Sequence, residues 1–498
     1  MTGVLAQVDP RSALSLGRAA LLRRIGYVAL LAAAPLLPSF GNSYWHYPEV
    51  SNFWVFAPLA ALFLVALADL RHPLSLLNLD LLALLCPALA LCCWRRSPAL
   101  ALVFLYPALL YLGVRMTLAA RAGHAAAGAP AEDADRLPRS WLAVGVAVLV
   151  LVQASWTLGG QARTDVGVAG VFGAHRLLHG EPVYGIDHAQ VAALGSDPHY
   201  DTYGPVVYEA YAPFVAVFGG DAARWAAFCF TLATAALLFA LGHRLRGPTA
   251  GVTLAYAWLA FPLTLYTGQL ADNDALVAAS LVAVLLFARS PARRGLAAAL
   301  AAWTKLSPLA LVPLLLAHAP EPCARRRGAA VFTAAFALAS FLALAPAMLH
   351  SSPGTFLART FGFQLGRPPA FSVWEELDYL AAGGARWLKP LSAVVHGLLI
   401  ASVATLALAL ARTRAGRDLA GLAAACAAVL IGLAICDGYF SLTYVLWFAP
   451  LALAATVLGR ERAAPAGTEA ASSAAAQAAP AAPQSITVSS RGRPVSVS

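Results

Sequence analysis

The sequence predicts an all-α, polytopic helical membrane protein with about 12–14 membrane helices. Of its 498 residues, 60% are hydrophobic and 12% are charged, whereas a soluble domain carries about 25% charged residues. Apolar runs recur from Arg24 to Gly459. Each run comes near the ~20 residues that a helix needs to cross a bilayer. Basic residues gather between these runs, as the positive-inside rule expects for cytoplasmic loops.

The formal net charge of +10 follows from this distribution of basic residues. Because the charge belongs to short loops between apolar runs, it indicates contact with membrane lipids and not with nucleic acid. The seven cysteines lie in apolar runs or in a basic loop, without a CxxC spacing. We interpret them as small buried hydrophobic residues, with neither a metal site nor a disulfide among them.

Composition divides the chain into four parts. A basic lead before the first apolar run predicts a cytoplasmic N-terminus, and the last part is rich in Ala, Ser and Pro, as disordered tails are. The four parts are an N-terminal block of about four membrane helices (1–120), a flexible Ala/Gly linker (121–138), a membrane domain (139–459) and a disordered cytoplasmic tail (460–498).

Two polar segments, which we call the first outer loop (160–221) and the second outer loop (350–386), interrupt the membrane domain. Within the first, residues 205–219 are apolar but too short to span. A short helix lying along the outer surface there keeps the basic turn 243–246 on the inside. The spans expected in this domain are 140–159, 222–242, 249–267, 273–288, 329–349, 387–411, 418–435 and 440–458.

Residues 295–318 are flanked by arginines on both sides. Arginines on both flanks favour the cytoplasmic side, but a single span would place the two flanks on opposite sides of the membrane. Two half-helices that meet at Lys305–Pro308 satisfy both flanks, because Pro308 blocks helix continuity and broken helices are tolerated where they line a cavity. Lys305 then lies ~15 Å deep. It should face a carboxylate, carbonyl groups or a bound anion, or else extend toward the turn.

Asp165 is the first candidate catalytic residue. It opens the segment DVGVAGVFGAHRLLHG, in which Thr164 or Asp165 suits a helix N-cap and Gly180 suits the helix end. An amphipathic helix between them rests on the outer bilayer surface. Asp165 is then held just above the membrane, where it serves either as a general base toward an acceptor hydroxyl or only as a cap.

Further polar residues gather at the same side of the membrane. An arginine among aromatic residues can hold a lipid phosphate through two hydrogen bonds, although a simple headgroup anchor is an equal alternative. The acidic and amide residues either hydrogen-bond a substrate or form a solvated turn. The candidate binding residues are Asp201 and Tyr203 in DTYGPVV, Gln269, Asn273 and Asp274 in GQLADND, Lys305, Arg359, and Arg367 in FQLGRPPAFSVW.

A divalent metal stays possible. His175 and His179 are four residues apart on one helix face, a spacing that can ligate a metal. No third ligand follows from spacing, so the two histidines are equally consistent with an ordinary interfacial pair.

Five segments together resemble glycosyltransferase family 87 of the GT-C superfamily of integral-membrane glycosyltransferases. They are DVGVAGVFGAHRLLHGEPVYG, DTYGPVVYEAYAPF, DNDALVA, TKLSPLALVPLLL and GFQLGRPPAFSVW. The resemblance covers roughly Trp141–Leu458. It implies a GT-C-like architecture, a catalytic acid at Asp165, a sugar donor linked to polyprenyl phosphate, and hexosyl or pentosyl transfer on the outer face of a bacterial plasma membrane.

Three functions are compatible with these observations. The first is a glycosyltransferase in which Asp165 deprotonates the acceptor and Arg367 stabilises the leaving polyprenyl phosphate. The second is a transporter or lipid flippase, favoured by Lys305 in a broken helix at mid-depth. The third is a non-catalytic scaffold for envelope assembly, in which the outer loops bind a partner.

Overall fold

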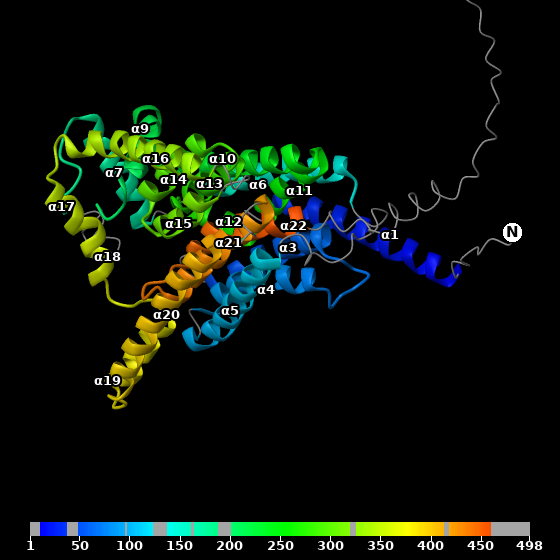
Figure 1. Cartoon of the computed structure of the whole chain (residues 1–498). Coiled ribbons are helices and arrows are strands. Elements are labelled where there is room, and N and C mark those ends of the chain that lie inside the picture. The colour runs from blue at the N-terminus through cyan, green and yellow to red at the C-terminus, as the bar shows by residue number, and fades with distance from the viewer. Residues whose placement is uncertain are drawn as a thin grey trace, which may run out of the picture.

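The computed structural model is a bundle of helices, shown in Figure 1. Within the described residues the only extended pairing is an isolated parallel bridge between Ala370 and Tyr439, so the predicted all-α class is confirmed. The linker residues 123–136 and the predicted tail lie outside the described residues. The structure describes residues 10–36, 48–94, 97–122, 137–160, 164–187, 201–318, 325–412 and 418–459.

Eight helices in these ranges are long and apolar enough to cross a membrane, and a ninth span results if a bent pair is counted as one. The chain is therefore a multi-pass membrane protein. The predicted number of about 12–14 also included segments that form shorter apolar helices. Those shorter helices are Phe53–Leu67, Asp274–Leu286 and Ser307–Ala317.

The N-terminal block, in which about four membrane helices were expected, is helical in its described residues. In α4 and α5, Asp80 is almost fully buried and accepts two hydrogen bonds from Arg115, each 3.0 Å long. Tyr111 donates a third at 2.9 Å. These bonds satisfy a charge that would otherwise be costly inside a membrane. The elements are α1 (Pro10–Ala33), η1 (Ala34–Leu36), α3 (Pro48–Leu67), α4 (Leu76–Trp94) and α5 (Pro98–Ala122).

The predicted short helix at 205–219 is present as α9 (Pro205–Phe218). Its fourteen residues extend ~21 Å, less than the ~30 Å of a bilayer core. Gly219, with φ +50°, ends it. The Tyr211 ring then lies 5.6 Å from the Phe230 ring of the next helix, so the chain folds back on itself. The neighbours are α6 (Arg139–Gly159), α7 (Asp165–Leu178), η4 (Gly219–Asp221) and α10 (Ala222–Arg246).

The segment predicted as a single span at 249–267 is bent by 55° at Phe261. Pro262 begins the second half, and a proline lacks the N–H that would continue the helix. The bend divides the segment into α11 (Pro248–Ala260) and α12 (Pro262–Gln269), and α13 (Asp274–Leu286) follows after a short turn.

The predicted half-helix pair is confirmed. The first half ends at Thr304, and Lys305 is extended at φ −140° and ψ 148°. Arg294 near the start donates a 2.8 Å hydrogen bond to the carbonyl of His318 at the end, so both ends lie on one side. The pair consists of α14 (Pro291–Thr304), η5 (Ser307–Leu311) and α15 (Val312–Ala317), followed by α16 (Arg325–Met348).

The second outer loop carries short helices, and the last three membrane helices follow it. Figure 1 shows two groups of helices, with α6, α10, α13, α14 and α16 in one and α4, α5, α20 and α21 in the other. The elements after α16 are α17 (Pro353–Leu357), the π-helix η6 (Ala358–Gly362), α18 (Phe363–Gly366), α19 (Val373–Ala382), α20 (Leu388–Arg412), α21 (Leu419–Cys436), η8 (Leu442–Tyr444) and α22 (Val445–Gly459).

Candidate functional site

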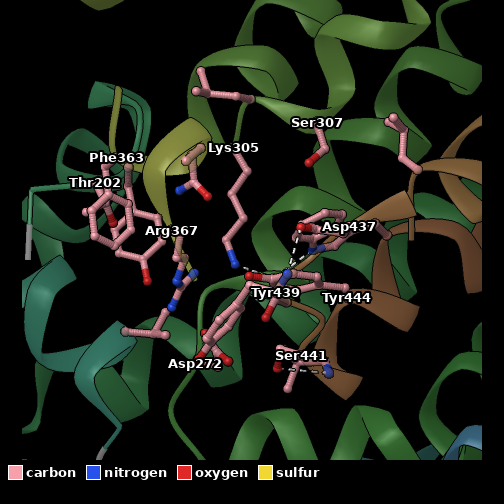
Figure 2. Close-up of a pocket in the computed structure, with 18 of the residues that line it drawn as sticks. Thr202, Asp272, Lys305, Ser307, Phe363, Arg367, Asp437, Tyr439, Ser441 and Tyr444 are labelled. Atoms are coloured by element: carbon pink, nitrogen blue, oxygen red, sulfur yellow. Dashed lines mark hydrogen bonds and ion pairs between the residues drawn. The ribbon is translucent and has the colours of Figure 1, made fainter. Parts of the chain in front are cut away.

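A cavity of about 550 Å³ is lined by residues of both outer loops and of the membrane helices. The lining comes from the start of α7, the α12–α13 turn, the break after α14, the second outer loop and the α21–η8 turn. In Figure 2 the side chains of Lys305, Arg367 and Asp272 reach toward one space. The charged and aromatic lining residues are Asp165, Tyr203, Asp272, Asp274, Lys305, Phe361, Phe363, Arg367, Asp437, Tyr439, Tyr444 and Trp447.

Asp165 reaches the cavity because α7 begins directly against the α12–α13 turn. Thr164 is the N-cap. Its hydroxyl accepts from the Gly167 N–H at 3.5 Å and donates to the Leu270 carbonyl at 3.1 Å. A Cβ on Gly167 would lie 2.5 Å from the carbonyl oxygen of Ala271, so the close approach requires glycine. Gly180, with φ +67°, ends the helix as predicted.

Lys305 faces a carboxylate, which is one of the partners that the sequence left open. Its Nζ lies 2.6 Å from Asp274 Oδ1, and Trp447 Nε1 donates to the same oxygen at 2.6 Å. The ammonium also lies 5.1–5.5 Å from the ring centres of Tyr203, Tyr444 and Trp447, within the range of cation–π attraction. The carboxylate and the three rings therefore hold the lysine in one position at the helix break.

Asp272 stands beside this pair on a strained turn. Ala271 has φ +54°, a left-handed conformation that costs an alanine energy and is typical of functional turns. Asp272 accepts a 2.7 Å hydrogen bond from the Asn273 N–H. Burial, and then the neighbouring Asp274 carboxylate, raise the pKa of Asp272 well above its usual value. Asp272 lies in the segment GQLADND but was not among the predicted binding residues.

Arg367 is held over an aromatic ring. Its Cζ lies 3.1 Å from the ring centre of Tyr439 and 5.3 Å from that of Phe363. The chain three residues later pairs with the α21–η8 turn. There, the Ala370 N–H donates to the Gly438 carbonyl at 3.0 Å. Stacking uses the face of the guanidinium and leaves its N–H groups, which lie in the plane, directed to the sides.

The turn between α21 and η8 supplies residues that the sequence analysis missed. Asp437 is polar in a short turn between two apolar spans, and burial raises its pKa from 3.8 to about 6. The segment CDGYFSLTY was the available signal, because an aspartate, a serine and a threonine interrupt an otherwise apolar and aromatic stretch. The missed lining residues from this part of the chain are Asp437, Tyr439, Ser441, Thr443, Tyr444 and Trp447.

Gln269 and Asn273 are buried beside the cavity and do not line it. Asn273 is fully buried, and its side-chain nitrogen and oxygen have no hydrogen-bond partner among the described residues. It lies between the two acids of the turn. The amide is therefore placed one layer behind the cavity wall.

Asp201 and Arg359 form a separate ion cluster. Arg359 Nη1 lies 3.0 Å from Asp187 Oδ1, and its Nε lies 3.7 Å from Asp201 Oδ2. The Gly185 N–H donates to Asp201 at 2.5 Å. Arg359 thus ties the second outer loop to the first, and neither it nor Asp201 lines the cavity, in contrast to Tyr203.

His175 and His179 stack with ring centres 4.1 Å apart, and His179 Nδ1 donates to the His175 carbonyl at 2.7 Å. Among the described residues no group of three or more His, Cys, Asp or Glu side chains has a geometry that would hold a metal ion. The pair does not line the cavity.

The family model of glycosyltransferase family 87 matches residues 202–436. No curated protein and no solved structure gives a match. The matched stretch contains Asp272, Asp274, Lys305 and Arg367, while Asp165 precedes it and the residues from Asp437 onward follow it. Together with the membrane helices, this match supports a glycosyltransferase family 87-like membrane protein, and the matched family indicates a glycosyltransferase.

Proposed function

We propose that the protein transfers a hexose or pentose from a polyprenyl-phosphate-linked donor to an acceptor hydroxyl, on the outer face of a bacterial plasma membrane. The N-terminus is then cytoplasmic. The main support is the meeting of Asp165, Lys305 and Arg367 at one cavity of about 550 Å³. That volume lies within the range of small-molecule sites, roughly 300–1,000 Å³.

Asp165 is the proposed general base. It accepts the proton of the acceptor hydroxyl as the hydroxyl oxygen attacks the anomeric carbon of the donor. The bond from that carbon to the phosphate oxygen breaks at the same time, and the carbon is inverted. The proton ends on the Asp165 carboxylate, and the electron pair of the broken bond stays with the phosphate.

Arg367 is the proposed partner of the leaving phosphate. Because its guanidinium is already stacked on Tyr439, little freedom remains to be lost when two of its N–H groups bind phosphate oxygens. Lys305 is largely neutralised by Asp274, and its role is to orient the sugar together with Asp272. Gln269 and Asn273 support this turn from behind.

Apolar residues at the cavity support a lipid-linked donor. Leu365 and Ile400 line the cavity, and they are 89% and 50% exposed. In a membrane, such side chains can contact an isoprenoid chain while the phosphate lies between the polar residues. The apolar tail of the donor and its phosphate thus contact an apolar and a polar part of the cavity that lie next to each other.

Asp165→Asn should abolish transfer of a labelled sugar from a polyprenyl-phosphate donor in membranes, because an amide cannot accept the acceptor's proton. Asp221→Asn serves as the matched control. Asp221 is an exposed acid of the first outer loop that pairs with Arg224, and its replacement should leave transfer unchanged. Equal transfer by wild type and Asp165→Asn would reject the assignment. Passage of the donor across liposome membranes without covalent change would point to a flippase instead.

A further inference from the structure

The N-terminal block touches the second outer loop close to Arg367. Trp94, the last residue of α4, places its ring 5.7 Å from the ring of Phe371. Tyr106 in α5 accepts a 3.1 Å hydrogen bond from the backbone N–H of Val373. Both helices precede the stretch that matches the family model.

Phe371 is the residue through which these contacts reach the cavity. Its φ of +56° is left-handed, which a bulky residue adopts only where its surroundings over-determine it. Its ring stands edge-on to Tyr439, with centres 5.6 Å apart and an angle of 88°. Tyr439 in turn carries the Arg367 guanidinium on its face. A continuous series of ring contacts thus leads from Trp94 to Arg367.

Backbone bonds hold the same loop from the other side. Ala370 donates to Gly438, Phe440 donates to Ala370, and Ser372 Oγ donates to the Gly438 carbonyl at 2.5 Å. These bonds fix the main chain but not the direction of the Phe371 ring, which stays 44% exposed. The ring is packed between Trp94 and Tyr439, so its direction depends on the N-terminal block.

We propose that α4 and α5 hold the second outer loop against the α21–η8 turn, so that Arg367 is kept on Tyr439 at the cavity. Trp94 and Tyr106 are then positioning residues for lipid-phosphate binding, and they act without contacting the substrate. This inference assigns a role to the N-terminal block. It rests on the proposed function for the role of Arg367, but not for the docking of the loop.

The test uses the full-length protein in nanodiscs, with Trp94→Ala and Tyr106→Phe. Farnesyl monophosphate is the probe of phosphate binding, and farnesol is the uncharged control ligand. Each variant should weaken farnesyl phosphate about two- to tenfold, the range expected for one aromatic pair or one hydrogen bond, and leave farnesol unchanged. Hydrogen exchange at the amides of Ala370 and Phe440 should become faster.

Transfer kinetics provide a second readout that a general loss of stability would not imitate. KM for the donor should rise about as much as the farnesyl phosphate Kd, with a smaller change in kcat. Trp94→Phe should restore most of the loss, because it keeps a ring against Phe371. Trp54→Ala is the control, since Trp54 is an exposed tryptophan of the same block whose ring contacts that of Phe53.

The outcomes separate the two proposals. Unchanged exchange at Ala370 and Phe440 in Tyr106→Phe, which keeps the ring and its packing, would overturn the inference even if Trp94→Ala failed to fold. Faster exchange in that variant, combined with normal farnesyl phosphate binding by Arg367→Ala, would support the docking of the loop and reject the role of Arg367. Faster exchange with unchanged farnesyl phosphate affinity in both N-terminal variants would reject Trp94 and Tyr106 as positioning residues.

Discussion

Asp274 and Lys305 form the most deeply buried ion pair of the cavity. Their side chains are 0% and 9% exposed, and the two charged atoms are 2.6 Å apart. Each charge is tolerated because the other is present. A buried ion without a partner is costly, whereas two neutral residues of similar shape in place of the ion pair often cost little stability. The pair therefore matters for stability as well as for orientation of a substrate.

Lys305→Met should destabilise the folded protein by about 3–5 kcal/mol, because it leaves the Asp274 carboxylate buried without a cation. The double variant Lys305→Met/Asp274→Asn removes both charges and should unfold at a higher temperature than Lys305→Met alone. Thermal unfolding of purified protein in mild detergent measures both. A single variant as stable as wild type would show that Trp447 alone satisfies the carboxylate.

Asp201 provides a pH response outside the membrane helices. Burial raises its pKa from 3.8 to about 6, against the opposing effect of the hydrogen bonds from Gly185 and Ile186, while Asp187 nearby adds a smaller increase. Arg359 Nε, at 3.7 Å, is too far to form a hydrogen bond. Between these two pKa values the folded chain binds more protons at this site than the unfolded chain does.

The contribution of Asp201 to stability is therefore complete below about pH 3.8 and is lost as the pH rises through about 6. The difference in unfolding temperature, wild type minus Asp201→Asn, should be larger at pH 5 than at pH 8. The asparagine variant cannot titrate, so it isolates this group from all others. A difference that is the same at both pH values would contradict the raised pKa.

At the scale of elements, glycines set how closely the pieces that carry the site approach. A Cβ on Gly204 would lie 1.9 Å from the carbonyl oxygen of Trp303, next to the break that carries Lys305. Along α7, a Cβ on Gly170 would lie 2.8 Å from the ring of Tyr211, and a Cβ on Gly173 would lie 2.1 Å from the ring of Tyr208, both of α9. The first outer loop thus meets the break after α14 with backbone against backbone, and its own helices α7 and α9 pack with backbone against ring.

Gly204→Ala should push Tyr203 away from Lys305. Overpacking of this kind costs about 1–3 kcal/mol, and sugar transfer should fall more than stability because the cavity wall itself moves. The measurement compares transfer rate and unfolding temperature for this variant with those for Gly366→Ala. A Cβ on Gly366 meets no atom within 4 Å, so that variant should resemble wild type. Normal transfer by Gly204→Ala would mean that the wall is compliant.

The helix breaks differ in how far the sequence reveals them. The break at Lys305 and the short helix at 205–219 could be predicted, because arginines on their flanks must stay on one side and Pro308 interrupts the helix. The bend at Phe261 was missed although Pro262 is visible. No charge near that segment requires two pieces, and a proline within a membrane helix is often accommodated as a kink.

The whole molecule has a topology that labelling can test. The half-helix pair returns to the side from which it starts, since Arg294 bonds to the His318 carbonyl. In a background without native cysteines, Arg293→Cys and Arg325→Cys should react with a membrane-impermeant maleimide only after permeabilisation. Glu181→Cys and Asp378→Cys, in the two outer loops, should react in intact cells. Labelling of 293 and 325 from opposite sides would demand a single straight span instead.

The site could be predicted only in part. Asp165, Asp274, Lys305 and Arg367 are conspicuous because a charged residue is costly in so apolar a chain, and all four line the cavity. Their convergence is a property of the packed helices, which no spacing reveals. Tyr439 and Trp447 were missed for a different reason. Aromatic residues at the end of an apolar span are typical of membrane interfaces, and their role here depends on a cation brought from elsewhere.

Ala271, next to the lining residue Asp272, and Phe371, whose ring contacts the lining residue Tyr439, both have left-handed backbones, at φ +54° and +56°. Glycine would adopt either conformation without strain. Both turns are therefore more strained, and also less flexible, than they would be with glycine. Engineering for thermal robustness would favour Ala271→Gly if the relief of strain exceeds the entropy that a new glycine adds to the unfolded chain. Such a gain in stability should lower the turnover number, because stability and activity place opposite requirements on this one residue.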